Sequence, residues 1–174
     1  PLPAAKPSFG VVIVDRYGRR FAQEIYKPYS FYWELSYFDT DRAEFPRIPA
    51  HMIFDERTRL EGPVANPSGP FGPMKLYEWS NDNSAEIEKG WIRKGETIRE
   101  LAEKIGVPPS ALENTVEEWN RSCRDGKDSA HGRDPSTLVP IDTPPYYEIV
   151  QWPGSGNTLG GPRRDKEARV VGTD

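Results

Sequence analysis

Three stretches of the chain have the hydrophobic pattern of β-structure. Residues 9–24 read FGVVIVDRYGRRFAQE, in which an apolar β-branched run meets a turn at Gly18 and then an alternating segment. This pattern predicts a β-hairpin. Residues 50–54, AHMIF, predict a short buried strand that ends at Asp55, and residues 146–152, YYEIVQW, alternate as a strand does.

Two adjacent stretches have the start signals of helices. Thr97 and Glu100 fit a capping box before the residues IRELAEKI, and Gly106 then ends that helix. Ser110 and Glu113 repeat the box before ALENTVEEWNRSC. In this second helix, apolar side chains at steps of four and three share one face: Leu112, Val116 and Trp119. The pattern therefore predicts a helix pair with a buried face.

Taken in order, these elements predict an α+β domain, with a small mixed or antiparallel sheet and the helix pair packed on it. Residues 62–73, GPVANPSGPFGP, predict a loop. An aromatic segment, residues 26–38, follows the hairpin, and the residues after Pro28 are expected to form a further helix. The aromatic side chains either pack in the core or line a pocket for a planar, apolar substrate.

Composition and charge narrow the classes of function. The chain has 174 residues, a net charge of −4 and 36% hydrophobic residues, which suits one domain with a core. No apolar run is long enough to span a membrane, and acidic residues outnumber basic ones in the helix pair, which argues against nucleic-acid binding. Cys123 has no second cysteine, and His51 and His131 lack a neighbouring ligand pattern, so we expect no metal site. His51 lies in an apolar run and is expected to be a packing residue.

A dinucleotide cofactor usually needs a G-x-G-x-x-G turn between a strand and a helix, and the chain contains no such motif. The nearest candidate is GSGNTLGG at residues 154–161, which is followed by Pro162 and charged residues. By itself this segment predicts a tight backbone turn, whose small residues would let a flat ligand approach closely.

Three segments, in order, carry a resemblance to a known family. They are VDRYGRRFAQE at residues 14–24, ETIRELAEKIGVPPSALENTVEEWN at 96–120, and PIDTPPYYEIVQWPGSGNTLGGPRRDKEARV at 140–170. The first is similar to a hairpin motif, V-N-x-x-G-x-R-F-x-N-E, and the third contains a T-x-G-G turn. Together they resemble the FAD-dependent fumarate reductase/succinate dehydrogenase flavoprotein family, which includes the 3-ketosteroid dehydrogenases.

The resemblance implies that residues 1–145 are the substrate-capping domain of a cytoplasmic FAD-dependent oxidoreductase. Residues 146–174 would then return toward an FAD-binding domain that is missing from this sequence. The parent enzyme would transfer a hydride between a substrate C–C bond and flavin, with FAD and a small-molecule substrate bound to the full-length protein. The fragment alone is expected to bind no FAD and to be inactive, and the abrupt start at Pro1 fits the edge of a larger flavoprotein.

The resemblance also implies site residues, with two departures from the family pattern. The T-x-G-G turn places Thr158, Gly160 and Gly161 near the flavin ring. Fumarate reductases have an arginine proton donor four residues after the hairpin glutamate, and a substrate-binding histidine just before the T-x-G-G threonine. These positions are Pro28 and Asn157 here. Because a C4-dicarboxylate needs cationic or donor groups for its charges, we do not expect fumarate reduction.

The aromatic segment is more similar to the ketosteroid dehydrogenase branch, in which a tyrosine of the cap acts on the substrate. That similarity makes Tyr29 the candidate catalytic residue and Tyr26 the second candidate. An alternative from a different class is a free-standing binding module, whose aromatic surface recognises a ligand or partner.

Overall fold

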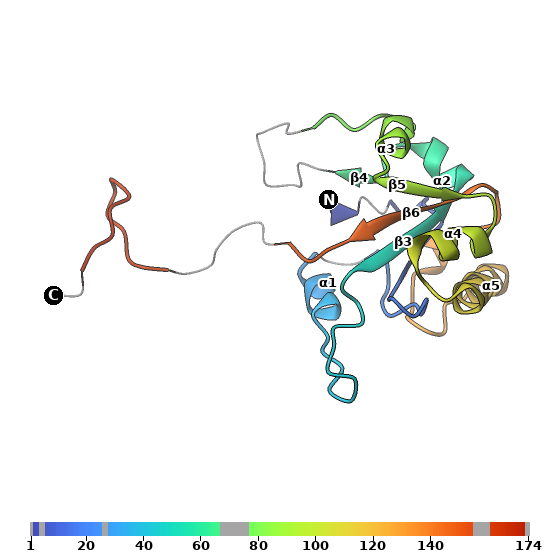
Figure 1. Ribbon diagram of the computed structural model, residues 1–174, viewed down its shortest axis with the longest axis horizontal. Helices are drawn as coiled ribbons and strands as arrows, with labels where there is room; N and C mark the ends of the chain where they lie inside the picture. The colour runs from blue at the N-terminus through green and yellow to red at the C-terminus, as the bar shows by residue number, and fades with distance from the viewer. Residues whose placement is uncertain (1, 4–5, 26–27, 67–76, 155–160, 173–174) are drawn as a thin grey trace.

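A four-stranded antiparallel sheet forms the centre of the protein (Figure 1). The computed structural model describes residues 2–3, 6–25, 28–66, 77–154 and 161–172. The strand order is β2-β3-β6-β5, and each neighbouring pair is antiparallel. These strands are β2 (Val11–Val14), β3 (Ala50–Asp55), β5 (Ile92–Gly95) and β6 (Tyr146–Gln151). A separate antiparallel pair joins β1 (Leu2–Pro3) to β4 (Ala65–Asn66).

Helices cover both faces of this sheet. They are α1 (Pro28–Leu35), α2 (Glu56–Glu61), α3 (Ser84–Glu88), α4 (Ile98–Ile105), α5 (Pro109–Asp125) and a short 3-10 helix, η1 (Pro135–Thr137). The α4–α5 pair packs on one face, and α1 lies against the other (Figure 1). This arrangement confirms the α+β class with a helix pair on a small antiparallel sheet. In the described part of the chain, no helix is long and apolar enough to cross a membrane.

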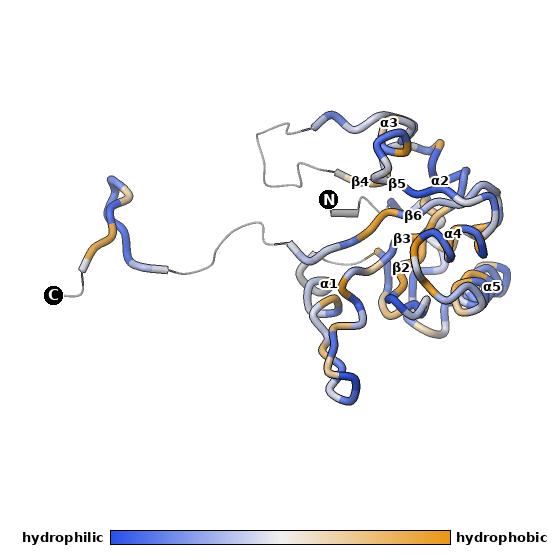
Figure 2. Tube along the Cα trace, viewed as in Figure 1, coloured by the Kyte–Doolittle hydropathy of each residue, from blue (hydrophilic) through white to orange (hydrophobic). Residues whose placement is uncertain are grey.

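Strands β2 and β3 are buried on both faces, which explains their continuous apolar runs. Val12 and Ile53 face the α4–α5 pair, whereas Ile13 and Met52 face α1. A strand that is covered on both faces has an unbroken run of apolar residues, and apolar and polar residues do not alternate along it. Figure 2 shows hydrophobic stretches of β2 and β3 between α1 and the helix pair. The predicted buried face of α5 is confirmed: Leu112, Val116 and Trp119.

The predicted hairpin over residues 9–24 does not form as a pair of strands. β2 pairs with β3, and a single bridge between Val14 and Arg20 is the only pairing within the predicted hairpin in the described residues. The turn itself is present, because Asp15 Oδ1 accepts hydrogen bonds from two backbone N–H groups of the turn, each at 2.9 Å.

Side chains occupy the edge of β2 where the second strand of a hairpin would pair. The Ile13 backbone N–H donates to Glu24 Oε1 at 3.3 Å, and the Val11 carbonyl oxygen accepts from Arg133 Nη1 at 2.9 Å. Arg133 comes from the loop after α5, so the local pattern of residues 9–24 could not reveal this contact. The buried charges close the edge of the sheet without a further strand.

The helix pair is confirmed. Of the two predicted capping boxes, only the one at the start of α4 is confirmed. Thr97 Oγ1 accepts from the Glu100 N–H at 3.1 Å, and Gly106 ends α4 in the left-handed conformation. By contrast, α5 begins at Pro109, and its cap residue makes no side-chain hydrogen bond. Ser110 therefore lies inside the helix, and the second capping box is wrong. Proline at the first helical position is the signal that applies, because its missing N–H is not needed there.

β6 is an inner strand, paired with β3 on one side and with β5 on the other. The sheet therefore continues to Gln151, past the boundary at residue 145 that the resemblance implies. Residues 161–172 form a turn with one bridge, between Arg164 and Val170, and Figure 1 shows them apart from the sheet.

Candidate functional site

A groove of about 860 Å³ opens at the end of the sheet where β2 and β6 finish and β3 and β5 begin. Its floor includes His51, Val150 and Arg93, which lie on the face of the sheet that carries α4. Because α4 ends before Gly106, it leaves this part of the sheet uncovered. Two tryptophans also line the groove, one directly before β5 and one directly after β6: Trp91 and Trp152.

Three polar side chains meet at the floor of the groove. Glu148 accepts two hydrogen bonds from the guanidinium of Arg93, from Nε to Oε2 at 2.7 Å and from Nη2 to Oε1 at 2.8 Å. Glu148 Oε1 also lies 2.6 Å from Nδ1 of His51. Because Glu148 is fully buried, the two-pronged contact with Arg93 offsets the cost of removing its carboxylate from water.

The contact with Glu148 determines which ring nitrogen of His51 remains available. A carboxylate oxygen only accepts hydrogen bonds, so Nδ1 carries a proton and donates to Glu148. Nε2 has no hydrogen-bond partner among the described residues, and the ring lines the groove. The packing role expected for His51 is therefore incomplete: the ring is buried, but it is held by a charge and borders open space.

An aromatic wall stands beside β5. The Tyr77 ring centroid lies 4.9 Å from that of Trp91 and 6.1 Å from that of Trp79. Their polar atoms have other partners, since the Tyr77 hydroxyl donates to Glu86 at 2.7 Å and Trp79 Nε1 donates to Asn83 at 2.8 Å. The rings therefore offer apolar surface to the groove.

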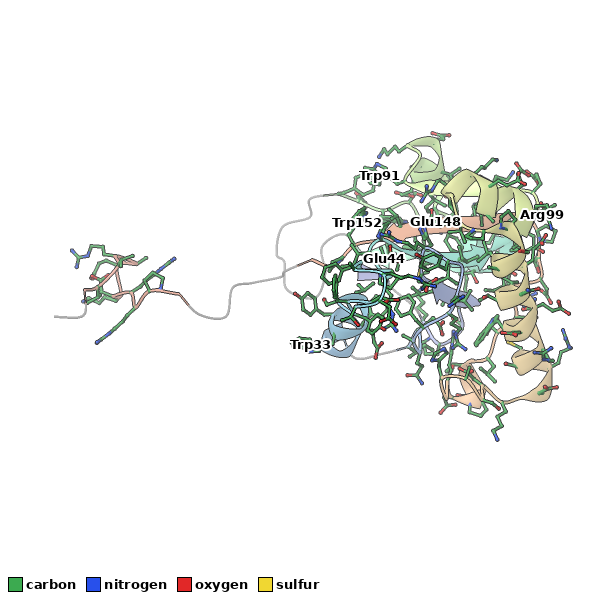
Figure 3. All side chains as sticks on the ribbon, turned by 60° about the horizontal axis from the view of Figure 1, so that its bottom comes forward. Trp33, Glu44, Trp91, Arg99, Glu148 and Trp152 are labelled. Atoms are coloured by element: carbon green, nitrogen blue, oxygen red, sulfur yellow. The ribbon has the colours of Figure 1, made fainter. Side chains whose placement is uncertain are left out.

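A second aromatic surface surrounds α1. Phe31 of this helix is buried in the core. Neighbouring rings are exposed: Tyr32, Trp33, Tyr37, Phe38 and Phe45. The aromatic segment thus supplies both core packing and exposed rings, the two possibilities that the sequence leaves open. Figure 3 shows Trp33, Trp91 and Trp152 on the side of the molecule from which the chain leads to residues 161–172.

The residues implied by the resemblance are only partly within the described structure. Tyr29 belongs to the first turn of α1, which begins at Pro28. Gly161 is exposed and has a φ of 124°, in the region that favours glycine. The remaining ones lie outside the described residues: Tyr26, Asn157, Thr158 and Gly160. The site roles of all these residues stay predictions.

Sequence reasoning missed the Arg93–Glu148 pair and the two tryptophans of the groove. Arg93 lies in β5, a short edge strand that no alternation predicts, and its partner is 55 positions away. One local signal was available: Glu148 is a charged residue inside the otherwise apolar centre of the predicted strand YYEIVQW. In the described part of the chain, no three His, Cys, Asp or Glu side chains gather as a metal ion requires.

The hairpin motif has a structural role, away from the groove. Arg20 Nε lies 2.6 Å from Glu24 Oε1, and Arg20 Nη2 lies 2.8 Å from Asp128 Oδ2. Arg133, which is also buried, approaches Glu24 at 3.4 Å. Burial by itself raises the pKa of Asp128, but the hydrogen bond from Arg20 and those from backbone N–H groups outweigh it and lower the pKa to about 2. We call these four side chains the ion cluster.

Several known proteins are similar to this chain over most of its length. A family model described as an FAD binding domain matches residues 4–174. The digoxin reductase of Eggerthella lenta is 40% identical over 164 residues, which make up 94% of this chain and 27% of that protein. The chain therefore spans less than a third of the length of this curated relative.

Two solved structures share the fold. The crystal structure of the 3-ketosteroid delta1-dehydrogenase from Sterolibacterium denitrificans, in complex with 1,4-androstadiene-3,17-dione, matches with a TM-score of 0.70 and 27% identity. That match covers 99% of this chain and 32% of the dehydrogenase. A solution structure of the fumarate reductase flavoprotein subunit from Lactobacillus plantarum matches with a TM-score of 0.58 and 22% identity, and the match covers 84% of each chain.

Proposed function

Because the chain belongs to the FAD binding domain family, we propose that it is one segment of an FAD-dependent oxidoreductase that acts on a CH–CH bond. The observation that carries this proposal is the family match over residues 4–174. The 40% identity to a protein named digoxin reductase and the fold shared with a ketosteroid dehydrogenase support it. In such an enzyme FAD supplies the hydride chemistry, while side chains of the protein bind the substrate and move the proton.

Within that enzyme we assign this segment to a cap over the substrate. The family description names an FAD binding domain, so the family match does not confirm the cap that the resemblance implies. The described residues nevertheless fit FAD poorly. A dinucleotide site uses parallel strands and a glycine-rich turn before a helix, whereas every strand pair described here is antiparallel. We therefore place the main contacts to FAD in other parts of the full-length protein.

The aromatic surface around α1 supports contact between this cap and a planar, largely apolar substrate. In the proposal Tyr29, in the first turn of α1, moves the proton, and Tyr26 is the second candidate. Pro28 stands where a fumarate reductase would carry its arginine, which argues against a dicarboxylate. We favour an alicyclic or polycyclic carbonyl compound. The return segment toward the flavin contributes the remaining proposed site residues: Asn157, Thr158, Gly160 and Gly161.

The test uses the full-length protein that contains this chain. The purified protein should carry FAD, and its anaerobically reduced form should be reoxidised by a cyclic enone but not by fumarate. Tyr29→Phe should slow this reoxidation by about 100-fold, the usual contribution of one proton-transferring side chain. Tyr146→Phe, which removes a hydroxyl beside the α4–α5 pair on the opposite face of the sheet, is the matched control and should have little effect. A protein without flavin would instead support the free-standing binding module.

The capping assignment has a separate test. FAD titrated into the 174-residue chain should give no saturable change in flavin fluorescence at micromolar concentrations. Binding at low micromolar concentrations would overturn the capping assignment and agree with the family description. It would leave the assignment to a flavoenzyme unaffected.

A further inference from the structure

We propose that the groove beside β5 binds a planar ring compound that carries a carboxylate group. In this proposal Arg93 and His51 bind the carboxylate, and Trp91 and Trp152 hold the ring. The inference goes beyond the proposed function, because the floor of the groove lies on the α4 side of the sheet. The helix with the proposed catalytic tyrosine, α1, packs on the opposite face.

The floor of the groove has polar atoms that make no hydrogen bond to any described residue. Arg93 donates to Glu148 through Nε and Nη2, which leaves Nη1 without a partner among the described residues. The Arg93 side chain is 36% exposed, so the guanidinium is accessible from the groove. His51 is only 5% exposed, and its Nε2 also lacks a partner in the described part of the chain. Among the described residues, the one fully buried side-chain nitrogen without a partner is Nε2 of Gln151, so Nε2 of His51 is open to the groove and available to a ligand there.

The charges around the groove favour an anion. The described residues that line it include Arg93 and also Arg16, which pairs with Glu44 outside the lining, but no aspartate or glutamate. Glu148 lies beneath the floor, and its carboxylate is already matched by the two-pronged contact with Arg93. A ligand carboxylate would accept from the free Nη1 of Arg93. His51 would then lie between two carboxylates, and an imidazolium ring donates to both.

Trp91 and Trp152 supply the apolar surface that a ring needs. They are 47% and 60% exposed, and they stand at the same end of two neighbouring strands. Val150 adds apolar surface between them. The volume of about 860 Å³ is within the range of roughly 300–1,000 Å³ that is typical of small-molecule sites. Lys89, with Nζ 5.1 Å from the Trp91 ring centroid, adds positive charge at this wall.

The test is a calorimetric titration of the 174-residue chain with 2-naphthoate, a flat aromatic carboxylate. We expect saturable binding, and binding at least about tenfold weaker for the neutral 2-naphthamide, because a hydrogen bond to a charged group contributes about that much. Arg93→Gln should weaken naphthoate binding by about tenfold for the same reason. Trp152→Ala should weaken the binding of both probes, since both contain the naphthalene ring that this tryptophan would contact.

Two matched variants serve as controls (Figure 3). Arg99→Gln removes an exposed arginine of α4 that pairs with Glu113, outside the groove. Trp33→Ala removes an exposed tryptophan of α1, on the opposite side of the sheet. Both should leave the affinity for 2-naphthoate within about twofold, because neither residue lines the groove.

Absence of saturable binding would overturn the proposal. Equal affinity for the acid and the amide, or an unchanged affinity of the Trp152→Ala variant, would also overturn it. Because Trp152 is exposed, that variant keeps the fold and remains decisive if circular dichroism shows that Arg93→Gln has unfolded. No flavin takes part in this titration, so its outcome is independent of the test of the flavoenzyme.

Discussion

Arg20 and Glu24 form a buried, two-pronged ion pair, with Nε–Oε1 and Nη2–Oε2 distances of 2.6 and 2.7 Å. Both residues belong to the segment VDRYGRRFAQE, which carries part of the family resemblance. Glu24 also accepts from the Ile13 N–H of β2 and from Arg133. In this chain the motif therefore joins the first strand of the sheet to the loop after α5.

Replacing Glu24→Gln should lower the free energy of unfolding by about 3 kcal/mol. The amide keeps the volume of the side chain but removes its charge, which leaves Arg133 buried without its carboxylate partner. Urea denaturation followed by far-ultraviolet circular dichroism measures the change. The matched control is Glu113→Gln, which breaks the exposed pair with Arg99 and should cost less than about 1 kcal/mol. Equal losses in the two variants would contradict a structural role of the ion cluster.

Asp128 should make stability depend on pH in the acid range. Burial raises its pKa, but the hydrogen bond from Arg20 and those from backbone N–H groups outweigh this and lower the pKa to about 2 in the folded protein, below the ordinary 3.8. The folded state then binds fewer protons than the unfolded state, so stability increases with pH across this window. The contribution of Asp128 is complete above about pH 4 and is lost as the pH falls toward 2.

The variant Asp128→Asn isolates this effect from that of the other carboxylates. It should be less stable than the native chain at neutral pH, and the difference should shrink as the pH falls from about 4 toward 2. Urea midpoints measured at intervals over this range give the two curves. Parallel curves would show that Asp128 titrates alike in the folded and unfolded states.

The sequence predicts elements whose signals are local. Thr97, Glu100 and Gly106 mark both ends of α4 because a helix cap depends on residues within a few positions of one another. The apolar run of β3 and the alternation of β6 are likewise local patterns. The partner of β2 could not be predicted, because Glu24 and Arg133 complete its edge through contacts across 11 and 122 positions.

The groove illustrates the same limit for a candidate site. The sequence predicts a packing role for His51 because its neighbours in sequence are apolar, and His51 is indeed buried. Its polar partner, Glu148, lies 97 positions away and is brought close only by the pairing of β3 with β6. Arg93 reaches the pair from β5, an edge strand of four residues that has no alternation to identify it. The family resemblance could be detected from the sequence because it rests on whole segments and not on contacts between distant residues.

The lone cysteine should react slowly in the folded chain. Burial raises the pKa of the Cys123 thiol to about 11. At about pH 8 the thiolate fraction, and with it the rate of alkylation by iodoacetamide, should be on the order of 100-fold lower than in urea-unfolded chain. The rate in the folded protein should then rise about tenfold per pH unit up to about pH 10. Equal rates in the folded and unfolded chains would contradict a raised pKa of this half-buried thiol.

Gly18 and Gly90 allow the backbone and packing contributions of a glycine to be separated. Both have positive φ, 75° and 71°, so a change to alanine should cost each about 1 kcal/mol through backbone strain. At Gly90 an added Cβ would meet no atom within 4 Å, whereas at Gly18 it would lie 3.0 Å from Val107 Cγ1 and 3.0 Å from the Leu112 nitrogen. Since the start of α5 must shift to admit that atom, Gly18→Ala should lose at least about 1 kcal/mol more than Gly90→Ala in urea denaturation. Equal losses would show that the turn after β2 is not packed against the helix pair.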